Sequence, residues 1–365
     1  SGYPPRDLLH REGFADACDQ TVSALASALP AGIGLLVGHP TLRSGSAGRI
    51  ANAASLLCDG QIVSTIHKTL LPNYDVFDER RYFRAADSIQ PIEFDGLRLG
   101  VHICEDAWWG APSTRYHDEP QRHVDPVAQL AQAGVDCLIN LPASPFERGK
   151  QNRRQELIRR HVERHQKPFV FVNQIGGNDD LVFDGNSFVL DASGRVCEQL
   201  PGFESALAIV DLTDLSPTNS IVPPRSEAEQ IDALILGLGD YVRKCGFTDC
   251  VLGLSGGIDS TLAAYIAAKA VGAEHVHGIA MPSRYSSQHS IDDARSLAEN
   301  LGIGFDLIPI DAMHNSYEHA PIVGEDLTSE PGGLADQNLQ ARIRGAIVMT
   351  RSNRRNWIAL ATGNK

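Results

Sequence analysis

The stretch "VLGLSGGIDSTLAAYIAAKAV" at residues 251–271 runs from strand-forming residues, through two glycines, two serines and an aspartate, into helix-forming residues. Gly256 and Gly257 let the backbone approach a ligand, and we expect both to take positive φ so that successive N–H groups point into one concavity. Ser255 and Ser260 add hydroxyl donors, and a helix starting near Ser260 offers its positive end. The pattern predicts an anion-binding cradle between a strand and a helix.

The cradle differs from the G-x-x-x-x-G-K-[ST] loop because it is short and lacks the lysine. Asp259 would repel a bare phosphate unless a divalent cation lay between them, so we expect Mg²⁺ with Asp259 as a ligand. The alternative is a capping serine with two structural glycines. That alternative is weaker, because a cap requires one serine and not the whole set.

The sequence around the cradle alternates between strand and helix patterns. They run as a helix at 227–246, a strand at 249–254, a helix at 260–272, a strand at 275–282, a helix at 291–303 and a strand at 305–310. This βαβαβ order is typical of a doubly wound, Rossmann-like parallel sheet that binds nucleotides.

The first part of the chain is also α/β but richer in short strands. From residue 31 to about 213, strand-like runs are separated by Asp-Gly pairs at 59–60 and 95–96, which mark hairpin turns, and the last such run is "ALAIVDL" at 206–212. Helices are expected at 126–134 and 149–166, which gives a layered α/β domain. The polar, proline-rich stretch 213–230 is predicted to be a linker. We therefore expect domains at 1–220 and 221–365.

Composition excludes several kinds of partner. A chain of 365 residues can hold two domains, and its formal net charge of −13 argues against general binding of nucleic acid or anionic membranes. The sequence contains no apolar run of about eighteen residues, the length of a membrane span. Its seven cysteines form no regular framework, which favours reduced thiols and a cytoplasmic location.

Cys104 is the candidate nucleophile. In "GLRLGVHICEDAWWG" at 96–110 it ends an apolar strand and precedes a turn, where the N–H of Glu105 could donate to an oxyanion. A buried cysteine alone is more often a packing residue. A Cys-His dyad with His102 is an alternative, but a packed strand histidine is favoured, since a side chain two residues away need not reach the sulfur.

Three stretches resemble the glutamine amidase domain of the nitrilase superfamily: 66–83, "CEDAWW" at 104–109 and "NLPASPFERGK" at 140–150. The resemblance implies an α-β-β-α sandwich and a Glu–Lys–Cys triad, with Cys104 as nucleophile and Lys68 as the cation at the oxyanion. In the family the basic Glu precedes a segment like "SGYPPRDLL", so we expect it upstream of Ser1. Low-ranked substitutes are Glu105, Asp106 and Glu147. The resemblance also implies glutamine binding by Tyr74, Ser144 and Lys150, whose structural alternatives are a surface aromatic, a turn cap and a solvated lysine.

The loop is similar to the S-G-G-x-D-S motif of ATP pyrophosphatases, which implies an ATP and pyrophosphate site formed by Gly253, Leu254, Ser255, Gly256, Gly257, Ile258, Asp259 and Ser260. Together, the two halves resemble the bacterial glutamine-dependent NAD⁺ synthetases. By that resemblance Arg284 and Thr362 are ATP contacts, and Asn338 and Arg342 are contacts to deamido-NAD⁺. A second metal-binding acid and the substrate-closing segments are expected beyond Lys365.

The implied reaction combines two activities. Glutamine is hydrolysed to glutamate and ammonia, and ATP adenylates the nicotinate carboxylate of deamido-NAD⁺ before amidation to NAD⁺, with AMP and pyrophosphate released. Ammonia must travel unprotonated, so the resemblance implies a sequestered passage and a homo-oligomer.

Two alternatives remain open. A GMP or asparagine synthetase would share the loop, but its cysteine is differently placed. A plain amidase with a nucleotide-sensing domain would not need Asp259.

Overall fold

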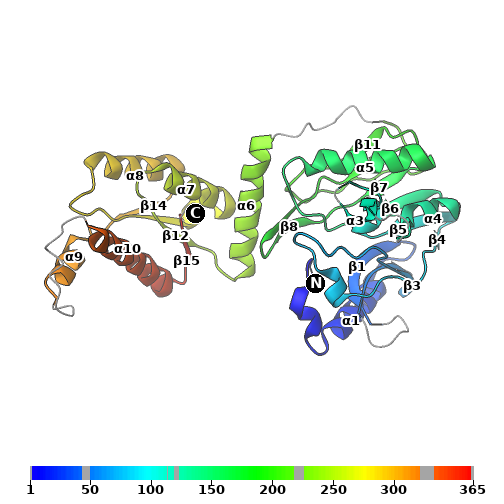
Figure 1. Cartoon of the computed structure of the whole chain (residues 1–365), viewed down its shortest axis with the longest axis horizontal. Coiled ribbons are helices and arrows are strands. Elements are labelled where there is room, and N and C mark those ends of the chain that lie inside the picture. The colour runs from blue at the N-terminus through cyan, green and yellow to red at the C-terminus, as the bar shows by residue number, and fades with distance from the viewer. Residues whose placement is uncertain are drawn as a thin grey trace. The chain divides into compact units, whose positions relative to one another are not determined.

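The computed structural model describes residues 2–42, 50–112, 114–118, 123–217, 226–320 and 333–362, and the chain divides into two compact units, Ser1–Gln230 and Ile231–Lys365 (Figure 1). The predicted domain boundary near 220, like residues 218–225 of the predicted linker, lies outside the described residues.

Two sheets form the first unit. The smaller is antiparallel, in the order β1 (Leu35–Thr41), β2 (Ala51–Cys58), β3 (Gln61–His67). The larger has the order β11-β10-β7-β6-β5-β4, formed by β4 (Ile92–Phe94), β5 (Leu97–His102), β6 (Cys137–Asn140), β7 (Phe169–Phe171), β10 (Phe188–Leu190) and β11 (Val196–Gln199). A separate hairpin joins β8 (Ile175–Asn178) to β9 (Leu181–Asp184).

Strand β2 explains the layering, because alternate side chains of a strand face opposite sides. Its Ala54 and Leu56 pack with Val101 of the larger sheet, while Leu57 packs with Val22 of the outer helix α1 (Phe14–Ala28). On the other side, α4 (Pro126–Gln132) and α5 (Lys150–His165) cover the larger sheet through a second apolar cluster. The unit is therefore an α-β-β-α sandwich, as expected. Short helical segments complete it: η1 (Arg6–His10), α2 (Glu79–Tyr82), η2 (Cys104–Trp108) and α3 (Arg115–Asp118).

One expected strand is wrong. Residues 206–212 form no strand, and Leu207 and Ile209 are 91% and 95% exposed. The apolar pattern is present, but no described strand pairs with this segment, so its backbone lacks the ladder that would make it a strand.

The second unit is built on a parallel sheet in the order β14-β13-β12-β15, with strands β12 (Cys250–Gly253), β13 (Val276–Ala280), β14 (Gly304–Leu307) and β15 (Ile358–Leu360). One face packs against α7 (Ile258–Val271) and α8 (Gln288–Leu301), and the other against α10 (Leu334–Arg355) (Figure 1). Strand order 3-2-1-4 with helices on both faces is the doubly wound arrangement predicted from the sequence.

Three further helical elements follow residue 225: α6 (Ser226–Lys244), η4 (Ala273–His275) and α9 (Asp311–Glu318). Helix α6 begins at Ser226, before the second unit starts at Ile231. Leu238 of α6 packs against the cluster beneath α7 and α8. Within the described ranges, no helix is both long and apolar enough to cross a membrane.

Candidate functional site

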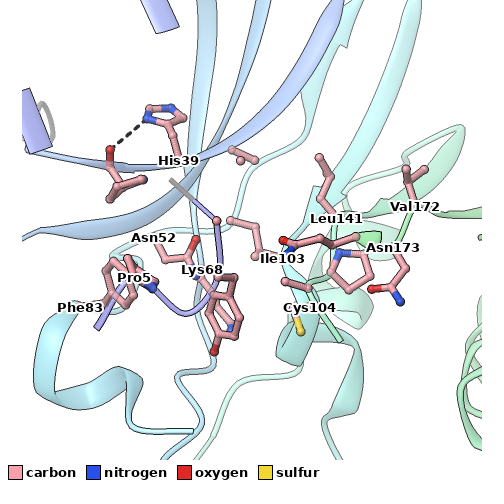
Figure 2. A pocket seen from close by; sticks show the side chains of 18 residues that line it. Pro5, His39, Asn52, Lys68, Phe83, Ile103, Cys104, Leu141, Val172 and Asn173 are labelled. Carbon is pink, nitrogen blue, oxygen red and sulfur yellow. Dashed lines mark hydrogen bonds between the residues drawn. The ribbon is translucent and has the colours of Figure 1, made fainter. Parts of the chain in front are cut away.

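A cavity of about 330 Å³ in the first unit is lined by both Cys104 and Lys68, together with residues such as Asn52, Phe83 and Asn173 (Figure 2). Lys68 directly follows β3, and Cys104 begins η2 just after β5. The structure therefore brings the predicted nucleophile and the predicted cation to one pocket, from the ends of strands in two different sheets.

Asp106 fixes this arrangement. Its Oδ1 accepts the N–H groups of Thr69 at 3.0 Å and Leu70 at 2.7 Å, and its Oδ2 accepts the N–H of Ile103 at 3.0 Å. One carboxylate thus ties the residues after Lys68 to the residue before Cys104. Burial raises the pKa of Asp106 to about 6 despite these donors. Asp106 is therefore committed to holding the two segments together.

The backbone at Cys104 is unusual. Its φ is 46°, in the left-handed region that non-glycine residues rarely adopt, and such conformations cluster at functional sites. Burial raises the pKa of the Cys104 thiol to about 11, although Lys68 acts in the opposite direction. The thiol is therefore neutral near pH 7, and attack by its sulfur requires a base to take the proton.

Lys68 has a buried partner that the sequence did not reveal. Its Nζ donates to Oε1 of Glu79 at 2.7 Å, and the two side chains are 1% and 3% exposed. Burial lowers the pKa of Lys68, but the charges of Glu79, Cys104 and Glu105 outweigh burial and raise it above its ordinary value. Lys68 therefore stays an ammonium beside the cysteine. Tyr3 also donates to Oε1 of Glu79, at 2.7 Å.

Tyr74 and Glu105 form a second buried pair. The Tyr74 hydroxyl donates to Oε1 of Glu105 at 2.5 Å, and Glu105 is 4% exposed. Burial raises the pKa of Glu105 to about 7, although Lys68 and the Tyr74 hydrogen bond favour its ionised form. Tyr74 is accordingly part of a polar cluster next to Cys104 and not a free surface aromatic.

The raised pKa of Glu105 makes stability depend on pH. The folded state holds a proton up to about pH 7, whereas the unfolded carboxyl loses it near the ordinary value of 4.5, so stability falls as pH rises through that window. The Glu105→Gln variant lacks this titrating carboxyl group. Relative to wild type, the free energy of unfolding of this variant should therefore rise by up to about 3 kcal/mol between pH 4.5 and pH 8.

Urea denaturation at several pH values checks this prediction. Glu163→Gln, at an exposed position of α5, is the matched control and should show no pH-dependent difference from wild type. A Glu105→Gln difference that stays constant across pH would contradict the account.

Ser144 is held by a buried arginine. Nε of Arg154 donates to Oγ of Ser144 at 3.0 Å, and the same guanidinium binds the Asp184 carboxylate at 2.8 Å. The Ser144 N–H donates to Oδ1 of Asn173 at 2.9 Å. The Ser144 hydroxyl therefore accepts from Arg154 in a buried setting, and Ser144 is not among the residues that line the cavity of Cys104 and Lys68.

Lys150 is the first residue of α5 and forms no ion pair within the described parts of the chain. Burial and Arg154 lower the pKa of Lys150, while the Cys104 charge raises it. Lys150 is partly buried, and it is not among the residues that line the cavity of Cys104 and Lys68. Its role stays a prediction.

The other candidates for a base are differently placed. His102 is 2% exposed, packs edge-on against Phe169 and bonds through Nδ1 to the carbonyl of Gly100 at 3.0 Å. Burial lowers the pKa of His102 to about 3. Glu147 is exposed and paired with Arg153 at 2.6 Å. The structure therefore favours a packing role for His102. Among the low-ranked substitutes for the catalytic base, Glu105 is the one that adjoins Cys104.

In the second unit, the glycine loop lies between β12 and α7, as predicted. Its contacts are made by hydroxyls: the N–H of Gly257 donates to Oγ of Ser255 at 3.2 Å, and the Ser255 and Ser260 hydroxyls are 3.1 Å apart. Within the part of the chain that the structure describes, the N–H groups of Gly256, Ile258 and Asp259 make no hydrogen bond. These donors are therefore available to an anion.

Only one of the two glycines adopts the expected conformation. Gly256 has φ of 78°, and a Cβ there would lie 2.5 Å from the carbonyl oxygen of Ser290. Gly257 has φ of −87° and ψ of 161°, so its predicted positive φ is wrong. Gly257 is the N-cap of α7, and the N-cap is normally extended. Asp259 follows in the first turn of α7 and is exposed.

A cavity of about 630 Å³ adjoins this loop. It lies where β12, β13 and β15 end, which is where ligands bind in doubly wound sheets. Gly253, Leu254, Ser255 and Thr362 line it, as expected of ATP contacts, and so does Arg344, which the sequence did not single out.

The remaining predicted residues are placed differently. Arg284 does not line this cavity and instead pairs with Glu318 at 3.2 Å and Asp311 at 3.7 Å. Asn338 and Arg342 are exposed on α10 and do not line the cavity beside the glycine loop. Their roles stay predictions.

The comparisons with known proteins agree with this two-part architecture. Residues 14–218 match the carbon-nitrogen hydrolase family, and residues 230–365 match the NAD synthase family. The chain is 42% identical over 379 residues to a glutamine-dependent NAD(+) synthetase of Synechocystis, and 33% identical over 401 residues to one of Aquifex aeolicus. These matches cover 100% of this chain and 66% and 67% of the relatives.

A solved structure is similar throughout. Glutamine-dependent NAD+ synthetase from Acinetobacter baumannii, in complex with ADP, matches with a TM-score of 0.87 and 36% identity, over 100% of this chain and 66% of that one. The chain thus spans about two thirds of the length of the relatives it matches. It belongs to the glutamine-dependent NAD⁺ synthetases, with a carbon-nitrogen hydrolase domain followed by an NAD synthase domain.

Proposed function

We propose that the chain supplies both chemical centres of a glutamine-dependent NAD⁺ synthetase. The observation that carries the proposal is the presence, in one chain, of the Lys68–Cys104 pocket and of a glycine loop with free N–H groups at the ends of a parallel sheet. The relatives' names support the same reaction.

In the first unit, the sulfur of Cys104 attacks the side-chain carboxamide carbon of glutamine, ammonia leaves, and water hydrolyses the glutamyl thioester to glutamate. The ammonium of Lys68 stabilises the negative oxygen that forms during attack, since a fixed charge in a buried site costs little reorganisation. Ser144 and Lys150 are donors suited to the carboxylate of glutamine, and Tyr74 with Glu105 offers acceptors to its amino group. Glu105 is the substitute base among the described residues, but we expect a separate Glu to serve as the base.

In the second unit, ATP binds at the glycine loop, and the nicotinate carboxylate of deamido-NAD⁺ attacks the α-phosphate. The carboxylate becomes an acyl adenylate, pyrophosphate leaves, and ammonia displaces AMP to form the amide of NAD⁺. The free N–H groups of the loop are suited to the pyrophosphate.

A divalent cation fits this loop. Mg²⁺ in nucleotide sites is usually held by one or two carboxylates, phosphate oxygens and waters, and Asp259 is one exposed carboxylate beside the free N–H groups. When bound, Mg²⁺ would neutralise charge on the departing pyrophosphate. Asp259 would hold it, while the loop amides position the phosphates.

Asp259→Asn tests this assignment. The variant keeps the shape of the side chain but loses its charge, so NAD⁺ synthesis should fall at least about a hundredfold with either glutamine or ammonium as nitrogen source. Glutamine hydrolysis should persist. Asp232→Asn, at an exposed position of α6, is the control. If the variant kept the wild-type rate of NAD⁺ synthesis and the same magnesium dependence, the assignment of Asp259 as a metal ligand would be wrong.

We also propose a cellular location, an oligomeric state and small-molecule partners for the enzyme. All seven cysteines lie in described ranges and are unpaired, which supports a reducing cytoplasm. We expect a sequestered passage for ammonia, because ammonia must stay unprotonated to act as a nucleophile, and a homo-oligomer whose subunits contribute walls to that passage. The partners are small molecules: glutamine, ATP and deamido-NAD⁺.

A further inference from the structure

Arg344 lies in the cavity beside the glycine loop, although the sequence suggested a different arginine there. It lies on α10, and its Nε donates to the carbonyl oxygen of Met281 at 3.0 Å. Met281 directly follows β13. The guanidinium is therefore anchored at the carboxyl end of the sheet, in the cavity that Ser255 and Thr362 also line.

No carboxylate among the described residues pairs with the charge of Arg344. The side chain forms no salt bridge within the described ranges, and its two terminal amino groups make no hydrogen bond there. Burial lowers the pKa of Arg344, which shows that its surroundings disfavour the charge. In a chain with 45 acidic residues and a net charge of −13, a half-buried arginine without a carboxylate partner is suited to an anion from outside.

Arg284, unlike Arg344, has partners for its guanidinium. Its guanidinium is engaged by Glu318, Asp311, Asn315 and Nδ1 of His314, so its donors are already used. Since His314 in turn bonds to Asp336 at 2.5 Å, this cluster is an internal ion-pair network. An anion entering the neighbouring cavity therefore meets Arg344.

We propose that Arg344 is an anion-binding residue of this cavity and that its two free amino groups contact a phosphate of the bound adenine nucleotide. The planar guanidinium matches two phosphate oxygens at once. The loop residues Gly253, Leu254 and Ser255 line the same cavity, and the residues with free N–H groups follow them directly in the chain. A nucleotide that binds to the loop therefore places its phosphates near Arg344. This inference rests on the proposed function, because it requires the cavity to bind a nucleotide.

Binding of ADP and of adenosine, measured by calorimetry, tests the proposal, since only ADP carries phosphate. Arg344→Gln should weaken ADP binding at least tenfold and change adenosine binding less than twofold. Arg344→Lys, which keeps the charge but not the fork, should recover part of the loss. Arg354→Gln, at an exposed position of the same helix, should leave both ligands within twofold of wild type.

The outcomes distinguish a failure of the proposed nucleotide site from a failure of the proposed role of Arg344. If wild type binds neither ligand, the proposed nucleotide site fails. If wild type binds ADP but Arg344→Gln weakens ADP and adenosine equally, or weakens neither, the role of Arg344 is overturned. A variant that loses deamido-NAD⁺ binding but keeps ADP binding would also overturn it and assign the guanidinium to deamido-NAD⁺. Thermal unfolding of Arg344→Gln and Arg344→Lys checks that both variants are folded when binding is compared.

Discussion

We expect Cys104→Ala to abolish glutamine hydrolysis, with a loss of at least about 10⁴-fold, and to leave NAD⁺ synthesis from ammonium salts close to wild type. The reason is that the substitution removes only the sulfur from the pocket that Cys104 and Lys68 line, while the glycine loop belongs to the other unit. Glutamate release and NAD⁺ formation, each assayed with glutamine or with ammonium, measure the two effects.

The control for this variant is Cys18→Ala, a partly exposed cysteine on α1 that should keep glutamine hydrolysis within twofold. If Cys104→Ala also eliminated the ammonium-supported reaction, or if it retained glutaminase activity, Cys104 would be a structural residue and not the nucleophile.

Lys68→Met should damage both stability and activity. The substitution leaves Glu79 buried without its counter-charge, and breaking a buried ion pair costs about 3–5 kcal/mol of unfolding free energy. The oxyanion also loses its cation, which lowers the rate of glutamine hydrolysis on the order of 10³-fold. Urea denaturation and the glutaminase assay measure the two losses separately.

The double variant Lys68→Met/Glu79→Gln distinguishes the two roles of the lysine. Since no charge is then left unpaired, most of the lost stability should return, while glutamine hydrolysis should remain low. Recovery of activity along with stability would mean that Lys68 supports the fold alone.

The sequence predicted the architecture where local patterns were strong. The alternation of strand and helix around the loop indicated a doubly wound sheet, and β12, α7 and β13 lie where the pattern placed them. Asp-Gly pairs likewise predicted the β2–β3 and β4–β5 hairpins. These features depend on residues that are close together in the chain, so the sequence alone can reveal them.

Contacts between distant segments could not be predicted in the same way. Glu79 meets Lys68 because a loop folds back over eleven residues, and nothing in the spacing marks that acid among its charged neighbours. Arg284 and Arg344 look equivalent in the sequence, and only the packing of α9 and α10 shows that one is paired and the other open. The segment 206–212 has a strand pattern but no partner strand among the described residues.

Transfer of labelled nitrogen tests most directly whether the two units work as one enzyme. With [amide-¹⁵N]glutamine, ATP and deamido-NAD⁺, we expect NAD⁺ carrying ¹⁵N in its carboxamide, together with one AMP and at least one glutamate for each NAD⁺, and no AMP when deamido-NAD⁺ is omitted. Glutamate release without AMP would instead indicate an amidase whose second domain only senses nucleotide. AMP formed with xanthylate or aspartate in place of deamido-NAD⁺ would contradict the account.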